Sequence, residues 1–122
     1  MCGITGIIRK KPIDNIEKIN ESINKLKKRG PDDSGIWISK EKNCVLGNSR
    51  LSIQDTSKKG AQPMLSDCGN YIILFNGEVY NKEFLKSNIP ENKKDNLNST
   101  SDTEILLNSL IHNGLKKNLP IN

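Results

Sequence analysis

Histidine, aromatic residues and long apolar segments are all scarce in this sequence. One histidine, His112, occurs among 122 residues, and aromatic residues make up 4% of the chain. No apolar run is long enough to cross a membrane, and the N-terminus carries no basic segment followed by an apolar stretch. The sequence therefore favours a cytoplasmic protein, and it offers little imidazole for a Cys–His catalytic pair.

Cysteine is also scarce, and its distribution argues against common structural uses. The three cysteines, Cys2, Cys44 and Cys68, form no CxxC pair and no cluster with histidine. A structural zinc site is therefore not expected, and we predict no metal site in this chain. An odd number of cysteines without a secretion signal indicates a reducing compartment.

The composition is polar for a globular domain. Hydrophobic residues make up 34% of the chain and charged residues 27%, which predicts one domain with a modest core. The net charge of +5 would permit acidic partners, but the lysines are scattered and not interleaved with aromatic residues. We interpret them as solvated surface residues, and we expect neither a nucleic-acid partner nor a membrane partner.

Hydrophobic periodicity predicts a chain of alternating strands and helices. Residues 3–8 form an apolar run that predicts a buried strand starting almost at the first residue. Residues 14–28 carry apolar side chains at helical spacing, which predicts an amphipathic helix. Further along we predict short strands at 36–38, 45–46 and 51–53, a turn at 40–43, a loop at 54–70, a central strand at 71–75, a short helix at 81–88 and a polar, flexible segment at 88–100.

A capping box predicts where the last helix begins. Ser101 and Glu104 have the spacing at which each side chain satisfies a free backbone N–H of the first turn. Gly114 is a plausible stop for this helix. His112 lies late in it, and we interpret it as a surface or helix-end residue rather than a catalytic base.

Cys2 is the first candidate for chemistry. Removal of Met1 would leave Cys2 with a free α-amine, so that the sulfur could attack a substrate while the amine relays the proton. An α-amino group has a pKa of about 7.7–8.0, which suits a base at working pH. The alternative is an ordinary apolar cysteine, and Cys2 considered alone favours that alternative.

The pair Asn76-Gly77 has two interpretations of about equal weight. It could be the turn of a two-residue β-hairpin, for which Asn-Gly is the strongest short signal. It could also form an oxyanion hole, in which the Asn76 amide and the Gly77 N–H point at negative charge developing on a carbonyl oxygen.

Charged residues near the predicted strand and helix ends are weaker candidates. Arg50 could bind a carboxylate in a two-pronged fashion, although a solvated strand-end arginine is commoner. Asp102 could hold a substrate ammonium, but local evidence favours support of the helix dipole. Glu78 is equally ambiguous. The segment 29–32 could be a structural turn or a clasp over the site.

The candidates gain weight from their combination, which resembles a known family. The chain resembles the class II glutamine amidotransferases, which are N-terminal-nucleophile hydrolases, and within them the glutaminase domain of asparagine synthetases. The resemblance spans residue 2 to about residue 112 and rests on these segments in order: Met-Cys-Gly-Ile-Thr-Gly-Ile-Ile at 1–8, Arg-Gly-Pro-Asp at 29–32, Gly-Ile-Trp at 35–37, Arg-Leu-Ser-Ile-Gln-Asp at 50–55, Gly-Ala-Gln-Pro-Met at 60–64, Phe-Asn-Gly-Glu-Val-Tyr-Asn at 75–81 and Ser-Asp-Thr-Glu at 101–104.

The resemblance implies a role for each matched position. Cys2 would attack the side-chain amide of glutamine, form a thioester and release ammonia. Asn76 and Gly77 would form the oxyanion hole. Arg50 would hold the carboxylate of glutamine, and Glu78 and Asp102 its α-ammonium. The pocket would be lined by Leu51, Ser52, Ile53 and Gln54.

The resemblance also implies a fold and partners. It implies an α+β fold, a four-layer αββα sandwich of antiparallel sheets, with residues 2–122 as an amidotransferase domain truncated at its C-terminal end. The chain itself would need no cofactor. A missing synthetase domain or subunit would use ATP and Mg²⁺ to amidate aspartate, and a homodimer is a candidate assembly.

One departure and two alternatives remain open. The family commonly has histidine where this chain has Asn48, which puts local packing in doubt. The chain could serve an asparagine synthetase-like enzyme with another acceptor for the ammonia. It could also be a catalytically silent fragment that only binds glutamine or a partner.

Overall fold

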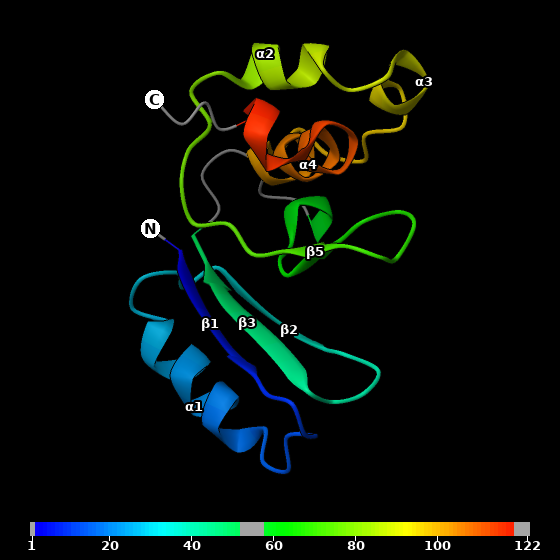
Figure 1. Ribbon diagram of the computed structural model, residues 1–122. Helices are drawn as coiled ribbons and strands as arrows, with labels where there is room; N and C mark the ends of the chain where they lie inside the picture. Colours follow the sequence, from blue (N-terminus) through cyan, green and yellow to red (C-terminus); the bar gives the residue numbers. More distant parts are fainter. Residues whose placement is uncertain (1, 52–57, 119–122) are drawn as a thin grey trace.

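The computed structural model describes residues 2–51 and 58–118, which fold into two antiparallel sheets and four α-helices (Figure 1). The first sheet has three strands in the order β1–β3–β2, and the second pairs β4 with β5. The strands are β1 (Gly3–Ile8), β2 (Asp33–Ile38), β3 (Cys44–Arg50), β4 (Met64–Leu65) and β5 (Ile72–Ile73). The helices are α1 (Glu17–Leu26), α2 (Lys82–Ser87), α3 (Glu91–Lys94) and α4 (Asp102–Asn118), with a 3₁₀ turn, η1, at Lys58–Gly60.

Helix α1 covers one face of the three-stranded sheet. Its buried residues Ile19 and Ile23 pack with Val45 of β3 and with Ile13, and these four residues are called the lower core. Close approach of the helix depends on glycine, because a Cβ on Gly47 would lie 2.7 Å from the Ile23 side chain. The amphipathic helix expected within 14–28 is therefore confirmed, with its apolar face against the sheet.

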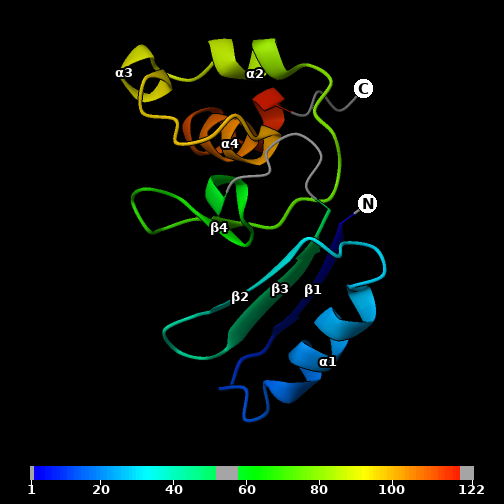
Figure 2. The same ribbon diagram turned by 180° about the vertical axis from the view of Figure 1, so that it is seen from behind.

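A second apolar cluster lies among the helices. Leu85 of α2, Ile89 and Ile105 of α4 are each no more than 3% exposed, and they are called the upper core. The hairpin β4–β5 and helix α4 stack beyond the face of the three-stranded sheet that α1 leaves uncovered (Figures 1 and 2). The mixed α and β class with antiparallel sheets is thus confirmed.

The start of α4 is fixed by side-chain hydrogen bonds that include one of the two bonds of the predicted capping box. The Glu104 N–H donates to the Ser101 hydroxyl at 3.4 Å, as that motif requires. The Glu104 carboxylate, however, accepts the N–H groups of Asn98 at 2.7 Å and Ser99 at 2.6 Å rather than that of Ser101. At the other end Gly114 has φ 72° and kinks the helix, which resumes to Asn118.

Two expectations for strands need correction. The strand at 3–8 exists, but it is not buried, because Ile4 is 46% and Ile8 77% exposed on the face away from α1. Residues 71–75 form no central strand, since β5 has two residues and its one partner in the described part of the chain is β4. The side chain of Gln62 takes the backbone hydrogen bonds of Phe75 that a longer strand would have needed.

Other segments differ in detail from the prediction. The predicted loop at 54–70 contains η1 and β4 in its described part, and the polar segment at 88–100 contains α3 and the buried Ile89. A separate strand was expected at 51–53, but β3 ends at Arg50 and Leu51 is not in a strand. Residues 52 and 53 lie outside the described part. The turn at 40–43, the helix at 81–88 and the exposed position of His112 are confirmed. None of the helices described is long and apolar enough to span a membrane.

Candidate active site

Cys2 lies at the end of the three-stranded sheet, directly before β1. Its sulfur accepts the Leu51 N–H at 3.4 Å and its thiol donates to the Leu51 carbonyl at 3.7 Å, so the Cys2 side chain is held against the backbone that leaves β3. The residue is half-buried. These two contacts place the predicted nucleophile beside Arg50, the last residue of β3.

Arg50 is buried, with 7% of its surface exposed, and is not the solvated strand-end arginine of the commoner case. Its carbonyl accepts the Asp32 N–H at 3.0 Å. The neighbouring Ser49 hydroxyl donates to the Gly30 carbonyl, and a Cβ on Gly30 would lie 2.3 Å from the Ser49 carbonyl oxygen. Segment 29–32 is therefore a structural turn held against the end of β3.

The strand pleat brings further polar groups to the same side of the sheet. Successive residues of β3 point to opposite faces, and Gly47 faces α1, so Asn48 and Arg50 lie on the opposite face. Asn48 is 1% exposed, and its Nδ2 has no hydrogen-bond partner among the residues described. Asn48 therefore presents a buried donor on the face of β3 that it shares with Arg50.

Gln62 links the sheet to the helical part of the structure, and the sequence analysis assigned it no role. Its Oε1 accepts the Phe75 N–H at 2.7 Å, and its Nε2 donates to the Phe75 carbonyl at 3.1 Å and to Thr103 Oγ1 at 3.0 Å. Its own carbonyl lies where a Cβ on Gly35 of β2 would be only 2.0 Å away. One side chain therefore fixes the residue before Asn76 relative to the residue after Asp102.

Gln62 could have been suspected from its place in a matched segment but not assigned a function. Its partners are 13 and 41 residues away in the chain, and no local pattern announces contacts of that range. The segment 60–64 therefore matches the family pattern, but the match does not indicate what Gln62 does.

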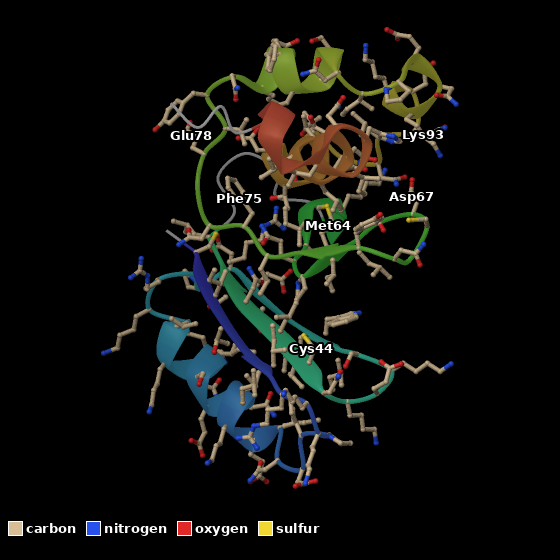
Figure 3. The ribbon with its side chains drawn as sticks, viewed as in Figure 1. Cys44, Met64, Asp67, Phe75, Glu78 and Lys93 are labelled. Atoms are coloured by element: carbon tan, nitrogen blue, oxygen red, sulfur yellow. The ribbon has the colours of Figure 1, made fainter. Side chains whose placement is uncertain are left out.

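The segment 76–78 is not a hairpin turn. Asn76, Gly77 and Glu78 are exposed and lead to α2 rather than to a strand (Figure 3). Neither Asn76 nor Gly77 has a positive φ, which a type I′ hairpin turn would need at both residues. Gly77 also makes room for a neighbour, because a Cβ there would lie 3.0 Å from the Phe75 ring. The hairpin interpretation is wrong, and the oxyanion-hole interpretation stays a prediction.

Asp102 begins α4 and is already engaged by cationic and backbone groups. It is 8% exposed, its Oδ2 accepts the Val79 N–H at 3.3 Å, and Lys82 Nζ lies 3.1 Å from its Oδ1. The same Nζ donates to the Thr100 carbonyl at 2.9 Å. The carboxylate therefore holds an ammonium group of the chain itself, and its role toward the α-ammonium of glutamine stays a prediction.

Two other cysteines lie away from these residues. Cys44 begins β3, and Cys68 is in the turn between β4 and β5 next to Asp67, which Figure 3 places at the tip of the hairpin. A hydrogen bond with the Ser66 hydroxyl lowers the pKa of the exposed Cys68 thiol, with help from the Asn70 backbone. Among residues 2–51 and 58–118, no group of three or more His, Cys, Asp or Glu side chains is placed to hold a metal ion.

The predicted site residues thus fall into two groups joined through Gln62. Cys2, Arg50 and Leu51 lie at the end of the three-stranded sheet, whereas 76–78 and Asp102 belong to the helical part. Ser52, Ile53 and Gln54 lie outside the described residues. No described contact yet joins Cys2 to Asn76 or Gly77.

Known proteins are similar in sequence to this chain over nearly all of its length. A family model described as a glutamine amidotransferase domain matches residues 1–120. The chain is 37% identical to glutamine-hydrolyzing asparagine synthetase 3 of Bacillus subtilis (strain 168), over 91% of the chain and 18% of that protein. It is 42% identical to putative glutamine-hydrolyzing asparagine synthetase 2 of Methanocaldococcus jannaschii, over 88% of the chain and 23% of that protein. It is also 33% identical to amidase chry2 of Gibberella zeae, over 94% of the chain and 18% of that protein. The chain therefore spans about a fifth of the length of these relatives.

Proposed function

The chain belongs to the glutamine amidotransferase family, and we propose that it hydrolyses the side-chain amide of glutamine to glutamate and ammonia. The observation that carries the proposal is the position of Cys2, whose sulfur is held on the Leu51 backbone directly beside the buried Arg50. A nucleophile and a carboxylate-binding group in adjacent positions suit a substrate that is itself an amino acid.

The chemistry proposed for Cys2 has two steps. The Cys2 sulfur attacks the amide carbon of glutamine, and the α-amine exposed by removal of Met1 takes the thiol proton and passes it to the departing ammonia. A thioester with the glutamyl group results. Water then attacks the thioester carbon while the amine takes a proton from it, the sulfur leaves with that proton, and glutamate is released. One water is consumed for each ammonia formed.

The remaining residues would bind the substrate and stabilise the transition state. Arg50 would pair with the glutamine carboxylate. The Asn76 side-chain amide and the Gly77 N–H would donate to the oxyanion. Both residues are exposed, and they directly follow Phe75, whose N–H donates to Gln62. Glu78 and Asp102 would hold the α-ammonium. Leu51, Ser52, Ile53 and Gln54 would line the pocket.

A larger enzyme is the proposed setting for this reaction. Relatives named as asparagine synthetases are several times longer than the residues they share with this chain. We therefore propose that the ammonia is used by a synthetase unit that amidates aspartate with ATP and Mg²⁺. The stacking of α1, the three-stranded sheet, the hairpin β4–β5 and α4 supports a four-layer αββα sandwich for the domain.

A different acceptor for the ammonia is the second candidate. The similarity to a protein named amidase chry2, over 94% of this chain, favours it, because the same domain occurs in a protein with another printed name. The residues proposed to handle glutamine do not choose the acceptor. The two candidates therefore share the glutaminase step and differ in the unit that receives ammonia.

Ammonia release from glutamine by the purified chain tests the proposal. Cys2→Ala should abolish release, whereas Cys68→Ala, which removes the exposed thiol of the hairpin, should leave it unchanged. Hydrolysis that persists in Cys2→Ala would overturn the thioester mechanism. A well-folded chain that releases no ammonia would favour a silent binding fragment.

The free α-amine has a test of its own. The mass of the N-terminal peptide should show cysteine as the first residue of the active protein. A form extended by one residue before Cys2 should be inactive, because its amine has become an amide. An extended form with normal turnover would contradict the role proposed for the amine.

A further inference from the structure

Lys82 places its ammonium group in a site built from two oxygen acceptors. Its Nζ lies 3.1 Å from Asp102 Oδ1 and donates to the Thr100 carbonyl at 2.9 Å. The other carboxylate oxygen of Asp102 is held by the Val79 N–H at 3.3 Å. A backbone donor thus fixes the carboxylate, and the lysine supplies the positive charge.

Burial separates the two partners of this ion pair. The Asp102 side chain is 9% exposed, whereas the Lys82 side chain is 33% exposed. The acceptors therefore belong to the structure at the start of α4, while the cation reaches them from the solvent side on a long stem. Such a stem has four rotatable bonds and can leave without disturbing α2.

The ammonium group of Lys82 and the α-ammonium of an amino acid have the same chemistry. Each carries one positive charge and three N–H donors, and each needs carboxylate or carbonyl oxygens. Asp102 is assigned to the α-ammonium of glutamine under the proposed function. Two ammonium groups at one carboxylate would repel each other, so Lys82 and substrate cannot both hold Asp102 in the same way.

We propose that Lys82 is an internal competitor for the α-ammonium of glutamine, a residue that sets the affinity of this chain for amino-acid substrates. This inference rests on the proposed function. Without substrate, Lys82 occupies Asp102 and Thr100. When Lys82 withdraws, the α-ammonium of glutamine takes its place at Asp102. The apparent affinity is reduced by the fraction of molecules in which the lysine still occupies the site.

A comparison of two lysines on one helix tests the competitor. Lys82→Met should lower KM for glutamine by about three- to tenfold with kcat unchanged, because the competing state is removed. Lys86→Met is the matched control, since Lys86 is exposed one turn further along the same face of α2, and it should leave KM unchanged. Lys82→Arg retains the cation and should keep KM high.

A substrate without the α-amino group separates competition from a general effect. Glutaramate carries the carboxylate and the amide of glutamine but no α-ammonium. Its KM should be the same for the original chain and for Lys82→Met. An equal fall of KM for glutamine and glutaramate would overturn the inference, as would an unchanged or raised KM for glutamine in Lys82→Met with an unaltered melting temperature.

Binding measurements keep this inference distinct from the proposed function. In a Cys2→Ala background, calorimetric titration should show tighter glutamine binding when Lys82→Met is added. Absence of Cys2-dependent ammonia release would overturn the proposed function alone, while equal binding of glutamine with and without Lys82 would overturn the competitor alone. Lys82→Gln replaces Lys82→Met if the methionine variant does not fold.

Discussion

At the scale of single residues, buried polar side chains are as numerous as buried apolar ones among the residues described. Asn48, Ser49, Arg50, Gln62 and the four residues 101–104 are all less than 9% exposed. Such groups generally need hydrogen-bond partners, because an unpaired buried polar atom costs free energy, and Asn48 Nδ2 is the exception among the residues described. Sequence patterns detect apolar periodicity and not these pairings. Local sequence therefore made Arg50 and Asp102 only weak candidates for the site and predicted no role for Gln62.

Gln62→Ala should lower the free energy of unfolding by about 2–4 kcal/mol, because it removes three hydrogen bonds and leaves the Phe75 backbone groups unpaired. Urea unfolding measures the change. Asn92→Ala, at an exposed position, is the control and should change it by less than about 0.5 kcal/mol. Hydrogen exchange of the Phe75 amide should accelerate in Gln62→Ala before global unfolding. Unchanged protection of that amide would remove Gln62 from its linking role.

Cys68 should be alkylated at a lower pH than an ordinary exposed cysteine, since the hydrogen bond from Ser66 lowers its pKa and raises the thiolate fraction at a given pH. Ser66→Ala should move the midpoint of the pH–rate profile upward, so that labelling below the midpoint becomes slower. Peptide mass spectrometry of iodoacetamide-treated protein measures both. The prediction matters for the active site, because a reagent aimed at Cys2 will also alkylate Cys68. Labelling of Cys2 must therefore be measured on the peptide that contains Cys2. Identical profiles for the two proteins would exclude the Ser66 effect.

At the scale of secondary structure, local signals predicted helices better than strands. The helix at 17–26 follows from apolar spacing, and the start of α4 follows from Ser101 and Glu104. The strand expected at 71–75 failed because a side chain from residue 62 satisfies the Phe75 backbone, which no local pattern reveals. The prediction of a hairpin turn at Asn76-Gly77 was wrong because the next element along the chain is helix α2 and not a strand. Short strands depend on distant partners, and helices mostly on their own residues.

Glu104→Ala should destabilise the protein by about 1–3 kcal/mol, because two backbone N–H groups and one hydroxyl lose their acceptor at the start of α4. Thermal or urea unfolding measures the loss. Glu91→Ala is the matched control: its side chain is 87% exposed and forms an ion pair with Lys94, so the change should be under about 0.5 kcal/mol. Equal effects of the two substitutions would show that the Glu104 contacts add nothing beyond a surface ion pair.

At the scale of the whole molecule, the structure has two small cores and a candidate site that spans both. Extensive packing occurs within each half, of α1 on β1 and β3 and of α4 on α2 and β5. Cys2 and Arg50 belong to the lower half, and Glu78 and Asp102 to the upper half. The order of the matched segments along the chain supplied the residues that we propose for the site. It could not predict that they divide between two cores, because that division depends on packing.

Substitutions in the two cores should therefore have separable effects on local stability. Ile19→Ala should cost about 2–5 kcal/mol by opening a cavity in the lower core, and hydrogen exchange should accelerate in β1 and β3 more than in α2 and α4. Leu85→Ala in the upper core should give the opposite pattern at a similar cost. Amide exchange followed by NMR or mass spectrometry distinguishes them.

Glutamine gives the decisive version of this comparison. A substrate held by Arg50 at one end and by Glu78 and Asp102 at the other would tie the halves together, since binding to the folded site stabilises both at once. In Cys2→Ala protein, saturating glutamine should therefore slow exchange in β3 and α4 together, whichever core carries the alanine substitution. Protection confined to one half would mean that the substrate contacts only that half, and the assignment of Arg50 and Asp102 to opposite ends of one glutamine would be wrong.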